Sequence, residues 1–211
     1  MISYSLYSQW AKDMPKPFAF INLDLFNQNI QSVLKRSENI AIRVASKSVR
    51  SVPMLSRILQ SNHRFIGIMA YHPLEAVSLS KEGFKNILMG YPCVDKAYIE
   101  QILNAPHPII FMVDAISQLE NINEVAERLN KTASVCLDVD MSSNFPGLRF
   151  GVWRSSTHNA EQALSIYHWI RTHEHIQLKG IMGYEAQIAG LGNHARGEFC
   201  RNKIITLLQN R

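Results

Sequence analysis

The sequence predicts an α/β fold in which parallel strands alternate with helices, arranged as a (βα) barrel of the TIM type. Apolar strand candidates begin at positions 18, 40, 65, 86, 108 and 133, at intervals of 21 to 25 residues, and another begins at 176. Helix-compatible stretches lie between most of them, and this alternation is typical of parallel βα units. The runs 65–70 and 109–113 are apolar throughout, as expected of strands covered on both faces.

The first elements follow a polar and aromatic leader. Residues 1–17 contain Pro15 and Pro17, and we expect them to be irregular. Phe18–Leu23 is the first strand candidate, and Asp24 stands where the cap of the next helix is expected. In that helix four apolar residues fall on one face, namely Phe26, Ile30, Val33 and Leu34.

The later helices are expected between the strand candidates. They are Val52–Gln60, with Pro53 in its first turn, then Pro73–Lys81, Val94–Leu103, Ile116–Asn130 and Asn159–His173, and after the last strand Phe199–Leu208. The absence of a glycine-rich nucleotide motif argues against an open dinucleotide-binding sheet, because Gly190 and Gly192 lack a third glycine and no P-loop is present. A barrel is favoured, yet seven strand candidates stand where eight are needed and the chain is shorter than about 250 residues. We therefore expect a truncated barrel.

Composition narrows the class of protein. A chain of 211 residues with 46% hydrophobic residues is typical of one globular domain. The net charge of +5 is spread along the chain without basic runs, which argues against a nucleic-acid partner and only weakly favours an anionic ligand. Three isolated cysteines, no signal peptide and no apolar run of about 20 residues predict a cytoplasmic protein without a membrane segment.

Lys47 is the strongest candidate for chemistry. The run Ile40–Arg50 begins apolar and β-branched and ends in a basic and hydroxyl cluster, so we expect a strand that carries Lys47 at its carboxyl end. Strand alternation would put Arg43 and Lys47 on one face, and both Arg43 and Arg50 are close enough in sequence to favour a neutral amine. Such an amine is suited to form an imine with an aldehyde, for example pyridoxal phosphate. The competing interpretation is an ordinary solvated lysine.

Other polar segments follow strand candidates, where a barrel gathers its site. The stronger two are Asp138–Asn144, continuing to Arg149 and Arg154, and Gly183–Gln187, and the weaker is Tyr71-His72. Asp138 and Asp140 share a strand face and could pair with Arg43, orient a ligand or bind a divalent metal. Charge pairing is favoured, since hard cations need several ligands. His168, His173 and His175 lie at an exposed helix end and are expected to be solvated, so no metal site is predicted.

Two segments carry a resemblance to a known family. Phe18-Ala-Phe-Ile-Asn-Leu-Asp24 followed by Ile42-Arg-Val-Ala-Ser-Lys47-Ser resembles the start of the alanine racemase-like fold of pyridoxal-phosphate enzymes. Together with Leu178-Lys-Gly-Ile-Met-Gly-Tyr184-Glu-Ala-Gln187, it looks closest to the D-threonine aldolase and amino-acid deaminase/aldolase branch. The resemblance covers residues 18–211 as an N-terminal barrel domain.

The resemblance implies roles for three residues. Lys47 would carry pyridoxal phosphate as an internal aldimine and transfer protons, and Arg149 would contact the phenolic oxygen of the cofactor. Tyr184 falls where racemases place a histidine against the cofactor ring, and tyrosine stacks but lacks the near-neutral titration of histidine. It further implies that Phe18–Leu23 belongs to a separate β-domain, leaving six barrel strands, and that the last two barrel strands and a C-terminal β-domain are missing.

The function expected from this resemblance is a pyridoxal-phosphate-dependent aldolase or deaminase acting on D- or β-hydroxy-amino acids. The main alternative is a cofactor-binding or inert remnant without catalysis, and a lesser one is an amino-acid racemase. The partner is a small amino-acid substrate. A homodimer is a further expectation, because an open barrel has unpaired strand edges.

Overall fold

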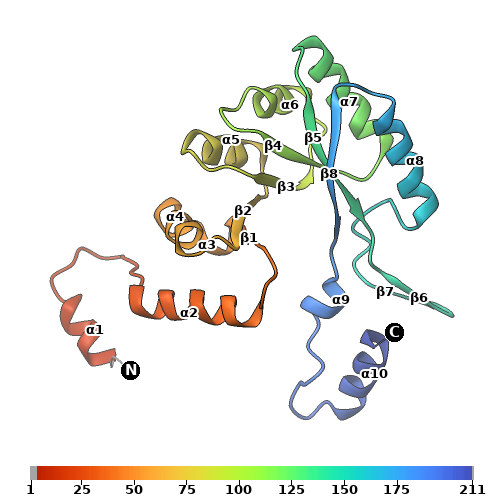
Figure 1. The fold of residues 1–211 in the computed structure, drawn as a ribbon. Coiled ribbons are helices and arrows are strands. Elements are labelled where there is room, and N and C mark those ends of the chain that lie inside the picture. The colour runs from red at the N-terminus through yellow and green to blue at the C-terminus, as the bar shows by residue number, and fades with distance from the viewer. Residues whose placement is uncertain (1–3, 211) are drawn as a thin grey trace. The chain divides into compact units, whose positions relative to one another are not determined.

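A computed structural model describes residues 4–210 of the chain, which form two compact units divided between Ala41 and Ile42 (Figure 1). The first unit contains helices α1 (Tyr4–Trp10) and α2 (Leu23–Arg36). In α2, Ile30 and Leu34 are buried. The expected shared apolar face is therefore confirmed for these two residues.

Two details of the first unit correct the predictions. The cap of α2 is Asn22, whose side-chain oxygen accepts hydrogen bonds from the backbone of Asp24 and Leu25 at 3.0 Å each, so Asp24 lies in the first turn instead. Residues 18–22 form no strand. A strand needs a hydrogen-bonding neighbour, and the described residues of this unit contain only helices and loops.

The leader is not wholly irregular, because residues 4–10 form α1; residues 1–3 lie outside the described part. Tyr7 anchors this helix within its unit. Its ring lies 5.0 Å from that of Phe20, and its hydroxyl accepts a hydrogen bond of 2.6 Å from the Asn22 side chain. The aromatic side chains, with Trp10 and Phe18, line a cleft of about 400 Å³. This local packing explains a helix that the prolines and polar residues did not predict.

The second unit is built on a six-stranded parallel sheet in the order β1-β2-β3-β4-β5-β8 (Figure 1). The strands are β1 (Ile42–Ala45), β2 (Phe65–Ala70), β3 (Ile87–Pro92), β4 (Ile109–Val113), β5 (Ala133–Val139) and β8 (Ile176–Gly183). All six predicted barrel strands are confirmed. Strands β1 and β8 are the two ends of the sheet order, so the sheet is a partial TIM-type barrel that does not close among the described residues.

Six helices lie where they were predicted. They are α4 (Val52–Ser61), α5 (Pro73–Lys81), α6 (Lys96–Leu103), α7 (Ile116–Arg128), α8 (Ala160–Arg171) and α10 (Phe199–Gln209). Two short helices, α3 (Ser46–Val49) and α9 (Ala186–Ala189), were not predicted and follow β1 and β8. Figure 1 shows α5 to α8 along one side of the sheet. An antiparallel hairpin of β6 (Ser143–Phe145) and β7 (Leu148–Phe150) is inserted after β5. No helix among residues 4–210 is long and apolar enough to cross a membrane.

The core of the second unit lies between the sheet and these helices. The central strands β2 and β4 are largely buried, as their apolar sequences predicted. The largest side chains with almost no exposed surface are Leu55, Ile68, Ile87, Met89, Ile99, Phe111, Met112, Leu119, Ile122 and Leu137. The core therefore joins every strand from β2 to β5 to a covering helix, which fixes the carboxyl ends of these strands relative to one another.

Candidate functional site

Lys47 lies at the carboxyl end of β1, as predicted, but one residue inside the short helix α3 and not on the strand. Ser46 is buried, whereas Lys47 is exposed. The amine Nζ lies 4.3 Å from the ring centroid of Tyr71, which follows β2. A cation over a tyrosine ring is attracted by the negative ring face. The weakest of the three predicted polar segments, Tyr71-His72, therefore supplies the neighbour of the lysine.

A row of aromatic and cationic side chains continues from Tyr71 across the strand ends. The Tyr71 ring lies 5.9 Å from that of Tyr91 on β3, at an interplanar angle of 64°. The guanidinium carbon Cζ of Arg154 lies 4.8 Å from the Tyr91 ring centroid and 5.2 Å from the Tyr184 ring centroid. Tyr184 directly follows β8. The structure thus brings the predicted residues Lys47 and Tyr184 into one continuous set of contacts.

Arg154 donates hydrogen bonds to residues of two strands, β3 and β5. Its Nε donates a hydrogen bond of 3.0 Å to Oδ2 of Asp138, and its Nη2 donates to the carbonyl oxygen of Gly90. The Asp138 side chain is only 3% exposed. Burial raises the pKa of Asp138, and the hydrogen bond and charge of Arg154 oppose that rise. Asp138 is therefore charge-paired, as predicted, but its partner is Arg154.

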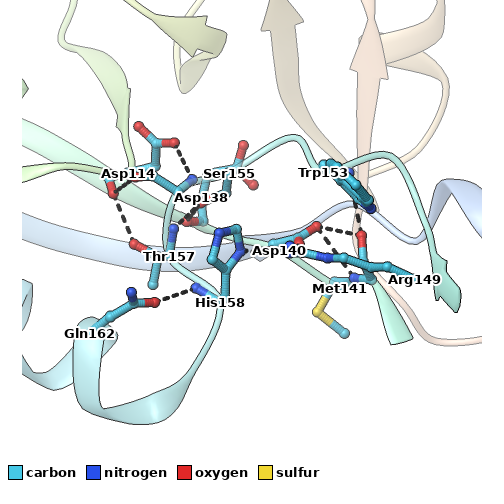
Figure 2. Close-up of polar contacts among 12 residues, drawn as sticks. Asp114, Asp138, Asp140, Met141, Arg149, Trp153, Ser155, Thr157, His158 and Gln162 are labelled. Carbon is cyan, nitrogen blue, oxygen red and sulfur yellow. Dashed lines mark hydrogen bonds and ion pairs between the residues drawn. The ribbon is translucent and has the colours of Figure 1, made fainter. Parts of the chain in front are cut away.

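Arg149, the third predicted site residue, lies on β7 and pairs with Asp140. Figure 2 shows Asp140 between Arg149 and His158. Nη2 of Arg149 donates to Asp140 Oδ2, and Nδ1 of His158 lies 3.2 Å from the same oxygen. Burial acts to raise the pKa of Asp140, but hydrogen bonds from Ser142 and Arg149 outweigh it and lower that pKa. The Arg149 guanidinium also lies 5.0 Å from the Trp153 ring.

The loop that carries Arg154 and His158 is anchored to the ends of β4 and β5 (Figure 2). Ser155 Oγ donates a hydrogen bond of 2.7 Å to the Asp138 carbonyl and accepts one of 3.0 Å from the Thr157 amide. Thr157 Oγ1 donates to the Asp114 carbonyl at 2.9 Å, and the Thr157 carbonyl accepts from the Asp140 amide at 2.8 Å. The hydroxyls of Ser155 and Thr157 thus form hydrogen bonds with backbone groups at the ends of β4 and β5, and these bonds hold the loop in one conformation.

Arg43 does not join this site. Its guanidinium donates to the Asn86 carbonyl and, at 2.8 Å, to the Asn86 side-chain oxygen. The path is open because Gly67 has no side chain, and a Cβ there would lie 2.9 Å from Arg43 Nη1. Arg50 turns back to the Lys47 carbonyl at 3.0 Å. The two arginines near Lys47 in sequence are therefore engaged with carbonyl and amide oxygens.

Neither Tyr91 nor His158 was singled out from the sequence, and Arg154 was placed in a polar segment of the expected site without a partner or a role. Tyr91 was detectable, because it lies near the carboxyl end of a predicted strand, as Lys47 and Tyr184 do. Arg154 and His158 lie in an irregular loop, and only the Ser155–Thr157 anchor brings them to the aspartates. No periodic pattern in the sequence marks such a loop.

Comparisons with known proteins agree with this fold. The family model of the alanine racemase N-terminal domain matches residues 21–204. Among solved structures, D-threonine aldolase from Filomicrobium marinum superposes with a TM-score of 0.69 at 19% identity, covering 93% of this chain and 52% of that one. Diaminopimelate decarboxylase from Helicobacter pylori, complexed with L-lysine, gives 0.65 at 18% identity, with coverages of 84% and 46%.

An alanine racemase from Clostridium difficile 630, in complex with cycloserine, gives a TM-score of 0.60 at 19% identity and covers 90% of this chain and 48% of its own. No curated protein sequence matches the chain. The chain spans about half the length of the three solved structures. At these identities the structures show the fold alone, while the family model covers most of the sequence. The chain therefore belongs to the alanine racemase N-terminal domain family, the barrel domain of fold-type III pyridoxal-phosphate enzymes.

Proposed function

We propose that the chain is the barrel part of a pyridoxal-phosphate-dependent lyase, an aldolase or deaminase that acts on D- or β-hydroxy-amino acids. The observation that carries this proposal is the position of Lys47. Its exposed amine lies at the carboxyl end of β1, 4.3 Å from the Tyr71 ring, in the row of aromatic and cationic side chains that reaches Tyr184. The carboxyl ends of the strands are where barrel enzymes build their active sites.

The residues present fit pyridoxal phosphate, a flat, anionic aldehyde. Lys47 offers an accessible primary amine, the Tyr71 ring offers a flat apolar surface beside it, and the Tyr91 and Tyr184 rings lie further along the same row. Arg149 Nε is buried and has no hydrogen-bond partner among the described residues. A buried donor without a partner is costly, and an anionic oxygen of a ligand would satisfy it.

When bound, pyridoxal phosphate acts as an electron sink for a carbanion at the amino-acid α-carbon. The chain's own residues would perform the remaining tasks. Lys47 would hold the cofactor's aldehyde carbon and take or return a proton at Nζ. Arg149 would donate from Nε to an anionic oxygen, and Tyr184 would lie against the cofactor ring.

We further propose that the protein is cytoplasmic and forms a homodimer. Cys93, Cys136 and Cys200 are free thiols, which agrees with a reducing compartment. Strands β1 and β8 each have one edge without a neighbour among the described residues, and such edges favour association. Sedimentation velocity of the 211-residue chain tests the dimer, for which we expect twice the monomer mass of 24.0 kDa.

The reaction is tested by offering D-threonine and D-alanine to the 211-residue chain loaded with pyridoxal phosphate. We expect D-threonine to be cleaved to glycine and acetaldehyde, and the Lys47→Ala variant to lose this reaction. Lys179→Ala is the control, because Lys179 is an exposed lysine of β8. Conversion of D-alanine to L-alanine without acetaldehyde would instead identify a racemase. Cofactor bound at Lys47 without turnover of either amino acid would identify a binding protein.

A further inference from the structure

We propose that Arg154 is a positioning residue that holds Tyr91 and Tyr184 in a fixed arrangement within the row of side chains that reaches Lys47. It does so through four contacts made by one side chain: two to the tyrosine rings and two hydrogen bonds to β3 and β5. The role in catalysis rests on the proposed function, because it presupposes that Lys47 holds the cofactor. That Arg154 restrains the two tyrosines follows from its four contacts and does not depend on the cofactor.

The four contacts use different parts of the guanidinium. Its edge donates to Asp138 Oδ2, at 3.0 Å, and to the Gly90 carbonyl. Its carbon lies 4.8 Å from the Tyr91 ring centroid and 5.2 Å from the Tyr184 ring centroid. A planar guanidinium can donate at its edge while aromatic rings approach its faces, which a lysine ammonium cannot do. The Arg154 side chain is 18% exposed, so these contacts are formed largely out of water.

The arrangement extends from Arg154 to Lys47. Tyr91 contacts Tyr71 at 5.9 Å between ring centroids, and Tyr71 contacts the Lys47 amine at 4.3 Å. Gly90 permits this packing, because a Cβ on Gly90 would lie 3.0 Å from the Tyr71 ring. The residue whose carbonyl accepts the hydrogen bond from Arg154 is therefore also the residue against which the Tyr71 ring packs. Displacement of Arg154 would disturb both tyrosines that lie between it and Lys47.

Arg154 is the neighbour that the two exposed tyrosines share, and Tyr91 also contacts the Tyr71 ring. Tyr91 is 48% exposed and Tyr184 is 43% exposed. Side chains this exposed ordinarily exchange between rotamers, and few apolar contacts oppose that motion. Arg154 is itself fixed by the buried Asp138 carboxylate, which is 3% exposed. The Asp138–Arg154 ion pair thus fixes the guanidinium relative to β5, and the guanidinium in turn restrains the rings of Tyr91 and Tyr184.

The test uses tyrosine rings labelled with ¹³C and the protein without cofactor. The ring signals of Tyr91 and Tyr184 are assigned by their disappearance in Tyr91→Phe and Tyr184→Phe. We expect both signals to shift or broaden in Arg154→Gln. We expect Arg154→Lys to fail to restore them, because a lysine keeps the charge without the planar fork. Arg171→Gln, an exposed arginine at the end of α8, is the matched control and leaves both signals in place.

Unchanged Tyr91 and Tyr184 signals in Arg154→Gln, or their restoration in Arg154→Lys, would overturn the proposal. Because Arg154→Gln leaves the buried Asp138 carboxylate without its partner, the variant could unfold. The double variant Asp138→Asn/Arg154→Gln removes both charges and keeps the test decisive, since the same shifts are expected in it. Far-ultraviolet circular dichroism verifies that each variant is folded.

A second measurement separates this inference from the proposed function. Pyridoxal phosphate is titrated into each variant, and the adduct on Lys47 is quantified after borohydride reduction. Wild type and Arg171→Gln are expected to form it equally, whereas Arg154→Gln and Arg154→Lys need about five to ten times more cofactor, which corresponds to losing contacts of about 1 to 1.4 kcal/mol. An absent adduct in wild type contradicts the proposed function alone. Equal titration of all variants, with unchanged tyrosine signals, contradicts the role of Arg154 alone.

Discussion

In the loop after β5, Nδ1 of His158 lies 3.2 Å from Oδ2 of Asp140, and Nη2 of Arg149 lies 2.9 Å from the same nitrogen. This nitrogen can donate to Asp140 when it carries a proton or accept from Arg149 when it does not, but it cannot do both. In either state Asp140 keeps its hydrogen bonds from Arg149 and Ser142. The Asp140 carboxylate is therefore the fixed member of the cluster.

The ionised form of Asp140 should stabilise the fold. Its pKa lies below the ordinary value of 3.8, so the stabilisation is complete above that pH and is lost as pH falls through the folded-state pKa. Asp140→Asn is expected to lower the free energy of unfolding by about 1 to 3 kcal/mol at pH 6, with a smaller difference at pH 3. Urea unfolding at both pH values measures this. An equal difference at both would show that Asp140 is not the titrating group.

The buried thiol of Cys136 is expected to make the folded protein less stable at alkaline pH. Burial raises the pKa of this thiol from 9.0 to about 11, with the Asp138 charge adding to the effect. The folded protein therefore keeps a proton that the unfolded chain releases above pH 9, and stability falls as pH rises to about 11, by about 3 kcal/mol from this group. Cys136→Ala should remove that part of the decline, and Cys200→Ala, at an exposed thiol, should not. Parallel curves for wild type and Cys136→Ala between pH 8 and 11 would contradict this.

Ser155 is expected to be required for the loop anchor. Ser155→Ala removes the hydrogen bond to the Asp138 carbonyl and leaves the buried Thr157 amide without its acceptor. We expect a loss of about 1 to 3 kcal/mol in the free energy of unfolding. Ser165→Ala on the exposed face of α8 is the control and should be near neutral. Chemical denaturation compares the two, and equal stability would show that the anchor does not depend on Ser155.

Gly151 ends the hairpin in a conformation that other residues avoid. Its φ is +154°, and a Cβ there would overlap the Ser142 side chain and backbone. Gly147, in the same hairpin, has a φ of +74° but no atom within 4 Å of an added Cβ. Gly151→Ala should therefore cost about 1 to 3 kcal/mol more than Gly147→Ala, since only the first adds a clash to backbone strain. Equal unfolding midpoints of the two variants would contradict the packing at Gly151.

The predicted strands were found where apolar runs of the right length lay between helix signals. Most residues of β2 and β4 are buried, although Ile66 of β2 is exposed, so continuous apolar sequence marked both strands correctly. Phe18–Leu23 has a similar composition but forms no strand, because a strand depends on a neighbour that local sequence cannot supply. Similarly, the aromatic contact of Tyr7 with Phe20 stabilises α1 across a loop that sequence reasoning judged irregular.

The site was predictable at the strand ends and not in the loops. Lys47 and Tyr184 follow the ends of β1 and β8 as expected, because apolar runs mark where a strand ends whatever its partners are, while their roles in a site stay predictions. Charge pairing of Asp138 was also expected, yet its partner was not. Arg43 was the buried candidate on a strand, whereas Arg154 reaches Asp138 only through the anchored loop. Pairings set by loop conformation depend on tertiary hydrogen bonds that no spacing rule encodes.

The most direct measurement identifies the residue of the 211-residue chain to which pyridoxal phosphate attaches. The protein is mixed with the cofactor, its absorbance recorded, and the mixture reduced with borohydride before peptide mass mapping. We predict a band at about 420 nm and a reduced adduct on Lys47, because this lysine alone among the predicted site residues offers an accessible amine. An adduct spread over surface lysines, or none at all, would contradict the assignment of Lys47 as the residue that holds the cofactor.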